Sequence, residues 1–233
     1  MFETMQKIAI ALMVGAAAVG AVRDWSRDVP SVTADYYTQT RTGGEIEARY
    51  TAMGEYDVTY AEYPARDVLI KRYEIWYPSD LAQENREWPV VVMANGTGVP
   101  ATRYAPVFRH LASWGFVVIG NEMQNSWSGE ASAGALDLLA ELNEDPSSPF
   151  FQKLDLDNVG SAGHSQGAIG AINAVTSQPN GDRYKALYLA STPSSLYSST
   201  LDWAYDPALI DIPCFMAAGT GLLDAGEAGS PEV

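Results

Sequence analysis

The stretch Gly163–Gly167, which reads GHSQG, matches Gly-x-Ser-x-Gly, the sharp turn that lifts a nucleophilic serine between a strand and a helix. The segment Asn158–Ala162 before it predicts a short buried strand that enters the turn. The small, apolar segment Ala168–Val175 after it predicts a helix packed on a sheet. A five-residue match is common by chance, but a strand before it and a helix after it make it specific. We therefore interpret Ser165 as a nucleophile, and the alternative is a structural glycine turn.

Apolar strands alternate with helical segments on both sides of this turn. The continuous apolar run Pro89–Ala94 is typical of a central parallel strand covered on both faces. Alternation of strands and helices predicts an α/β fold with a doubly wound, mostly parallel sheet. The other expected strands are Tyr56–Tyr60 at the sheet edge, Val68–Tyr77, Phe116–Gly120, Tyr184–Ala190 and Ile212–Ala218, and the other expected helices are Tyr104–Trp114 and Ala131–Leu142.

Composition places the chain among ordinary globular proteins. Its 233 residues suffice for one large domain, with 47% hydrophobic and 18% charged residues. The net charge of −15 argues against nucleic acid and anionic membrane surfaces as partners, because both would repel it. A single cysteine, Cys214, excludes an internal disulfide and a cysteine-built metal site, and two histidines argue against a histidine-rich metal site. Because its neighbours are apolar, we expect a buried structural thiol at Cys214.

The amino terminus differs from the rest of the chain. An uncharged run, Ile8–Val22, lies between Lys7 and Arg23 and is 15 residues long. That length is short for a bilayer span but suits a signal-peptide core or a marginal anchor. We expect residues 1–22 to be a signal peptide or membrane anchor of a secreted or membrane-tethered protein. The alternative is an amphipathic or buried helix of a cytoplasmic protein. An extension over residues 23–55 would then precede the α/β domain, residues 56–233.

A serine hydroxyl is a poor nucleophile until a base takes its proton and a third group orients that base. On a sheet of this kind the partners follow in the chain order serine, acid, histidine. The only histidines, His110 and His164, do not follow Ser165. We interpret His110 as an exposed or packed helix residue, and we expect the His164 ring to point away from the partner of the serine hydroxyl.

The sequence ends at Val233, before the expected last strand, histidine-bearing loop and last helix. We therefore expect a carboxyl-terminally incomplete domain, a fragment of a longer hydrolase. Asp224 is the candidate acid, because it lies just beyond the strand Ile212–Ala218. Glu227 is the second candidate, and the alternative is that both carboxylates only solvate a loop.

An oxyanion hole needs two backbone N–H groups aimed at the developing negative charge. One comes from the residue after the nucleophile, which is Gln166 here. The other is expected from the loop after the central strand, Asn95–Gly98. By position Thr97 is the expected donor and Gly96 is the second choice. The alternative is an ordinary turn at the end of a strand.

Three segments carry a family resemblance: Pro89–Gly98, Leu111–Val118, and Leu142–Phe150 running on to Gly163–Gly167. In these segments the chain resembles the bacterial cutinase-like and polyester-hydrolase branch of the α/β-hydrolases, close to the dienelactone hydrolases. The resemblance covers about residues 74–221.

The resemblance implies that Ser165 is the nucleophile and that Thr97 and Gln166 are the amide donors. It implies cleavage of small-molecule or polymeric carboxylic esters without a metal or an organic cofactor. The chain departs from the family at Thr97, where an aromatic residue is usual, and at Thr192–Ser195, where polyester-degrading members place an aromatic clamp. A short-acyl esterase is therefore the expected form.

Two other functions remain open at this point. The fold could serve as a non-catalytic binding module or pseudoenzyme, because no histidine follows the serine. The same serine could also cleave peptides or transfer acyl groups.

Overall fold

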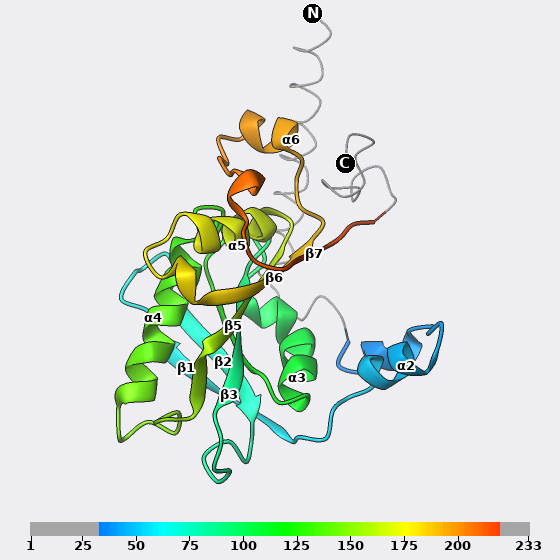
Figure 1. Ribbon diagram of the computed structural model, residues 1–233, viewed down its shortest axis with the longest axis vertical. Helices are drawn as coiled ribbons and strands as arrows, with labels where there is room; N and C mark the ends of the chain where they lie inside the picture. The colour runs from blue at the N-terminus through cyan, green and yellow to red at the C-terminus, as the bar shows by residue number, and fades with distance from the viewer. Residues whose placement is uncertain (1–32, 220–233) are drawn as a thin grey trace, which may run out of the picture.

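One seven-stranded sheet runs through residues 33–219, the part of the chain that the computed structural model describes (Figure 1). The strands lie side by side in the order β1-β2-β4-β3-β5-β6-β7. Strand β2 runs antiparallel to its neighbours β1 and β4, and all other pairs are parallel. The strands are β1 Val58–Pro64, β2 Arg72–Pro78, β3 Trp88–Ala94, β4 Val117–Asn121, β5 Leu154–His164, β6 Tyr184–Ala190 and β7 Cys214–Ala217.

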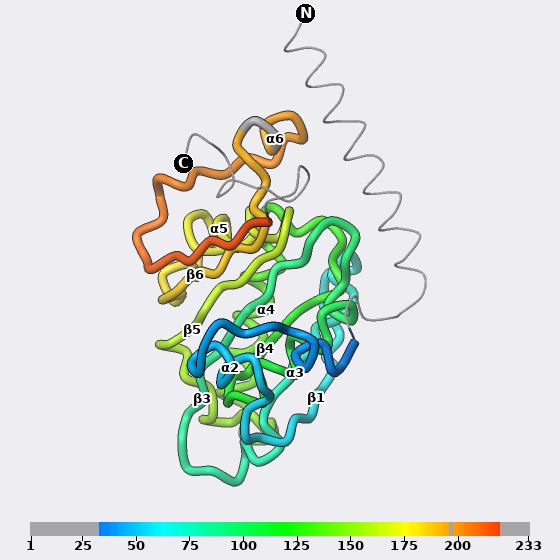
Figure 2. The backbone as a smooth tube through the Cα atoms, turned by 90° about the vertical axis from the view of Figure 1, so that its right-hand side faces the viewer, coloured from blue at the N-terminus to red at the C-terminus, as the bar shows by residue number. Residues whose placement is uncertain are grey.

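Helices cover both faces of this sheet: α3 lies on one face, and α4 and α5 lie on the other (Figure 1, Figure 2). Side-chain alternation along β3 explains this arrangement, because successive residues of a strand point to opposite faces. Val90 and Val92 join the core under α4, and Val91 and Met93 pack on the α3 side. The helices are α2 Glu45–Thr51, α3 Ala105–Ser113, α4 Glu130–Glu144, α5 Gln166–Thr176 and α6 Ser195–Thr200, with 3₁₀ turns η1 Tyr36–Gln39, η2 Ala101–Tyr104, η3 Gly181–Arg183 and η4 Pro207–Leu209.

The α/β architecture predicted from hydrophobic patterning is confirmed. Each expected strand and helix occurs, and Tyr184–Ala190 has the bounds that were predicted. Strand β3 lies near the middle of the sheet, between β4 and β5, and β1 lies at an edge. Coverage of β3 on both faces is only partly confirmed, because Val91 and Met93 are half-buried. They line an open apolar groove of about 730 Å³ on the α3 side of the sheet.

The prediction of a buried thiol at Cys214 is wrong, because Cys214 is exposed. Strand β7 pairs only with β6 among the described strands, so its neighbours cover it on one side alone. Next to it, Phe215 is 65% exposed and stacks on Tyr188 of β6, with ring centroids 5.9 Å apart. The apolar sequence therefore predicted the strand correctly, but it did not predict whether that strand is buried.

The predicted strand Val68–Tyr77 also begins later than expected. Lys71 has a φ of 64°, a left-handed conformation that no regular strand accommodates, and β2 starts at Arg72. The preceding residues form a turn in which Asp67 Oδ1 accepts the Leu69 N–H at 2.7 Å. This turn leaves Val68 83% exposed.

Several expectations fall outside the described residues: the leader or anchor at residues 1–22, and the acid candidates Asp224 and Glu227. Between residues 33 and 219, none of the helices has the length and apolarity needed to cross a bilayer.

Candidate active site

Ser165 occupies a strained turn between β5 and α5. Its φ is 55° and its ψ is −125°, a conformation that costs a residue with a side chain on the order of 1–3 kcal/mol. The turn is held by hydrogen bonds from the Ser165 N–H to Ala190 O at 2.8 Å and from the Ala168 N–H to Ser165 O at 2.9 Å. The strand–turn–helix context predicted for Gly-x-Ser-x-Gly is confirmed. Residues in such strained conformations persist where the surrounding structure holds them, and they cluster at functional sites.

The two glycines of the turn are required by close backbone approach. A Cβ on Gly163 would lie 2.1 Å from Gly167 O, and a Cβ on Gly167 would lie 2.1 Å from Ala94 O. Any larger residue would push α5 away from the ends of β3 and β5. The spacing of the motif therefore reflects the packing of this helix against two strand ends.

The loop after β3 lies beside the serine turn. Ala94, the last residue of β3, pairs in register with Gly163. A Cβ on Gly96 would be 3.0 Å from His164 Nδ1, so the loop backbone touches the turn directly. The structure thus brings the Thr97 loop and Gln166 to the same edge of the sheet. Among residues 33–219, the amides of Thr97 and Gln166 donate to no backbone acceptor.

Gly96, the second choice for the oxyanion donor, is already engaged. Its N–H donates to Tyr104 Oη at 3.0 Å, and the same oxygen is 3.0 Å from His164 Nδ1. Burial raises the pKa of Tyr104 to about 12, so this hydroxyl stays protonated near neutral pH. These contacts favour Thr97 over Gly96 as the available donor.

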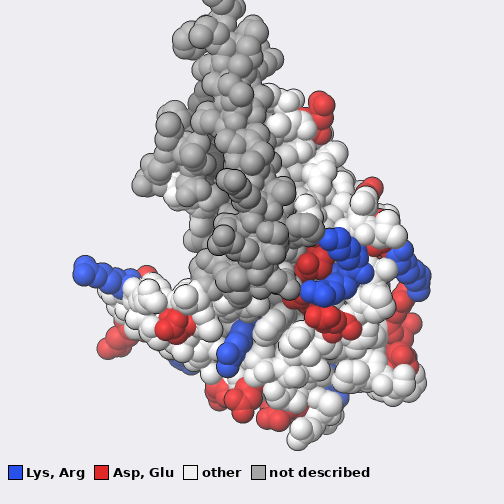
Figure 3. Space-filling model, turned by 180° about the vertical axis from the view of Figure 1, so that it is seen from behind, with Lys and Arg blue, Asp and Glu red and all other residues white. Residues whose placement is uncertain are grey.

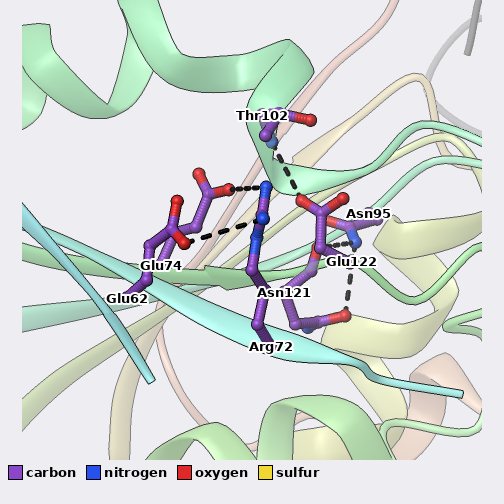
Figure 4. A network of polar contacts seen from close by, with 7 residues as sticks. All are labelled: Glu62, Arg72, Glu74, Asn95, Thr102, Asn121 and Glu122. Atoms are coloured by element: carbon purple, nitrogen blue, oxygen red, sulfur yellow. Dashed lines mark hydrogen bonds and ion pairs between the residues drawn. The ribbon is translucent and has the colours of Figure 1, made fainter. Parts of the chain in front are cut away.

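A buried polar network lies at the carboxyl ends of β3 and β4 (Figure 4). The Asn95 side chain is fully buried, and its Nδ2 donates to Asn121 O at 2.6 Å and to Met123 O at 2.9 Å. Glu122, one residue past β4, accepts the Thr102 N–H at 3.4 Å. The loop after β3 is therefore tied at both ends to the segment that follows β4.

An acidic cluster adjoins this network (Figure 4). Arg72 lies 3.4 Å from Glu74 and 3.6 Å from Glu62. Glu74 is only 2% exposed, and burial raises its pKa to about 7, with a smaller contribution from the charge of Glu122, while Arg72 opposes the shift. Glu74 therefore gains its charge near neutral pH.

This raised pKa should make the stability of the fold depend on pH. In the folded protein Glu74 holds its proton up to about pH 7, against about 4.5 for an ordinary glutamate. Its stabilising contribution is then fully present below pH 4.5 and is lost as the pH rises through 7. We expect a loss on the order of 1–3 kcal/mol of unfolding free energy between pH 4.5 and 8. Urea unfolding should show a shallower pH dependence in Glu74→Gln than in the native protein, and Glu87→Gln, at an exposed glutamate outside this cluster, should keep the native slope. An identical slope in all three proteins would contradict the assignment.

His110 is a packed structural residue, one of the two forms expected. Its Nε2 lies 3.0 Å from the carbonyl oxygen of Tyr50, and its Nδ1 lies 3.0 Å from Tyr36 Oη. Because a carbonyl only accepts, Nε2 carries a proton, and in the neutral ring Nδ1 then accepts from the tyrosine hydroxyl. Both ring nitrogens are engaged in joining α3 to the segment before β1. His164 instead turns its Nδ1 toward Tyr104.

Sequence reasoning missed the contribution of the segment after β4. Gln166 is buried, its Oε1 accepts the Ser126 N–H at 3.0 Å, and its Nε2 donates to Asn125 Oδ1 at 2.7 Å. The available signal was the polar run Asn121–Ser126 directly after a buried strand, because residues at the carboxyl ends of parallel strands gather at one edge.

No protein-family model matches the chain, and no curated protein matches it significantly. The function is therefore argued from the fold and from the geometry around Ser165.

Proposed function

We propose that this chain is a serine-dependent carboxylic ester hydrolase of the α/β-hydrolase superfamily, related to its cutinase-like and dienelactone-hydrolase branch. The observation that carries the proposal is Ser165 at a φ of 55°, on a turn between a parallel strand and a buried helix. In that superfamily this turn exposes the nucleophilic hydroxyl above the sheet. The loop that would supply the second oxyanion donor lies beside the same turn.

The proposed reaction proceeds through an acyl-enzyme. Ser165 Oγ attacks the acyl carbon while a general base takes its proton, and the amides of Thr97 and Gln166 bind the oxyanion. The base then returns the proton to the departing alcohol, and water resolves the ester formed on Ser165. His110 is not this base, because both of its nitrogens are bonded elsewhere. Asp224 is the proposed acid that orients the base.

Charge and site composition support an uncharged ester as substrate. Figure 3 shows acidic side chains distributed over the described surface of one side of the molecule, with basic side chains among them. At a net charge of −15, nucleic acid is disfavoured as a partner. By the family resemblance, Thr97 and the segment Thr192–Ser195 occupy the positions of the aromatic rings that would stack on an aromatic polyester. Short-chain aliphatic esters are therefore the proposed substrates.

Turnover of p-nitrophenyl acetate, butyrate and octanoate by the chain tests this proposal. We expect serine-dependent release of nitrophenol that is faster with butyrate than with octanoate. The second candidate function is a non-catalytic binding module, favoured by the complete engagement of His110. Absence of turnover with all three esters, in a protein that also contains the histidine-bearing segment expected after the acid, would support that candidate and overturn the esterase proposal. Turnover that is lost on His164→Gln would identify His164 as the base.

A further inference from the structure

The segment Asn121–Ser126, which is the last residue of β4 and the five residues after it, is here called the β4 loop and is hydrogen-bonded to the neighbourhoods of both proposed oxyanion donors. Toward β3, its carbonyls accept from Asn95 Nδ2, and Gln124 O accepts the Gly98 N–H at 2.9 Å. Ser126 Oγ donates to the backbone oxygen of Asn95. The residues on either side of Gly96 and Thr97 are thus fixed to this one loop.

The other end of the β4 loop is bonded to the residue after the nucleophile. The Gln166 side chain both accepts from the Ser126 N–H at 3.0 Å and donates to Asn125 Oδ1 at 2.7 Å. Gln166 is 1% exposed, so water does not compete effectively for these bonds. Its backbone N–H, at the first position of α5, is the proposed first oxyanion donor.

We propose that the β4 loop, through the side chains of Asn95 and Gln166, is a clamp that sets the separation and direction of the two oxyanion amides. This proposal rests on the proposed function. Asn95 and Gln166 are positioning residues in this role, since their side chains act through the Thr97 and Gln166 N–H groups. Two donors on separate elements, a strand-end loop and a helix start, become one unit because a third element holds both.

Such support is needed because the loop after β3 is intrinsically pliable. Thr97 lies between two glycines, and Gly98 has a φ of 66°. An oxyanion donor works only about 2.7–3.1 Å from the oxygen that it stabilises. A misplacement of about 1 Å can cost up to about 100-fold in rate. The clamp supplies the rigidity that the glycines remove.

Two substitutions break the clamp on the Gln166 side: Gln166→Leu removes both side-chain bonds, and Asn125→Ala removes one at an exposed position. We expect kcat for p-nitrophenyl butyrate to fall about 10- to 100-fold in Gln166→Leu and less in Asn125→Ala, with KM within about twofold. Gln166→Glu keeps an acceptor for the Ser126 N–H but loses the donor to Asn125 and adds a buried negative charge, so kcat should stay low. The control Gln178→Leu removes a bond to Ser128 O, just past the clamp, and should keep the native kcat. Native kcat in Gln166→Leu would overturn the positioning role.

Amide hydrogen exchange tests the clamp without reference to catalysis. The Gly96 and Gly98 N–H groups are hydrogen-bonded in the loop, so their exchange reports its rigidity. We expect exchange about 10-fold faster or more in Gln166→Leu and Asn125→Ala, although neither substitution touches the glycines, and native exchange in Gln178→Leu. Unchanged exchange at both glycines would overturn the clamp whether or not the chain hydrolyses esters. If exchange is faster in the two variants but the native protein does not hydrolyse esters, the result would support the clamp and count against the proposed function.

Discussion

Replacing Ser165 with alanine is expected to lower kcat for p-nitrophenyl butyrate by about 10⁴-fold or more, because it removes the atom that forms the acyl-enzyme. The fold should survive the change. Alanine carries the same Cβ as serine, so the strain of the 55° φ is unchanged. The Ser165 backbone bonds to Ala190 and Ala168 are also kept. Steady-state kinetics beside circular dichroism and thermal unfolding would separate the lost nucleophile from lost structure.

Ser161→Ala is the matched control for this substitution. Ser161 lies on the same strand β5 and is 2% exposed, and within the described residues its hydroxyl makes a single, long 3.5 Å bond to Ala171 O. It should keep native kcat, since its hydroxyl plays no part in the proposed chemistry. Substantial activity in Ser165→Ala, or equal losses in both variants, would contradict the assignment of Ser165 as nucleophile.

Gly167→Ala is expected to lower the free energy of unfolding by about 2–4 kcal/mol, as overpacking against rigid backbone does. The added Cβ would lie 2.1 Å from Ala94 O and 2.5 Å from Asn95 O, neither of which can turn aside as a flexible side chain could. Helix propensity alone points the other way, since alanine within a helix is favoured over glycine by about 1 kcal/mol. The sign of the measured change therefore separates the two effects, and urea unfolding measures it.

Gly160→Ala provides the comparison, because it adds the same methyl group to β5, which also lies against β3. The nearest atom to its Cβ is Val90 O at 3.8 Å, an ordinary contact. Its unfolding free energy should stay within about 1 kcal/mol of the native value. A stabilised Gly167→Ala, or similar changes in both variants, would mean that α5 does not approach β3 as closely as described.

The sequence was sufficient for the order and type of the main elements because buried strands and helices leave strong periodicity. Strand β3 could be placed at the centre from its apolar run alone. The burial of Cys214 could not be predicted, because burial depends on which neighbours cover a strand. The start of β2 was misplaced because the apolar residues before Lys71 are typical of a strand. In the structure the left-handed φ of 64° at Lys71 interrupts the extended backbone there. Short helices such as α2 and α6 left too little periodicity to detect.

The candidate site was predictable where one short motif contains the whole geometry. Gly163–Gly167 indicated the turn, the strand before it and the helix after it, and the structure has all three. The preference for Thr97 over Gly96 needed the structure, because it depends on Tyr104 accepting the Gly96 N–H. The two bonds of the Gln166 side chain also join residues about 40 positions apart, which no local pattern reveals.

The most direct test of the central claim is labelling with a fluorophosphonate, which phosphonylates only an activated serine, followed by peptide mass spectrometry. If Ser165 is the nucleophile, one adduct forms on the peptide that contains residues 163–167, and no adduct forms in Ser165→Ala. An unlabelled native protein, or labelling that persists in Ser165→Ala, would contradict the claim.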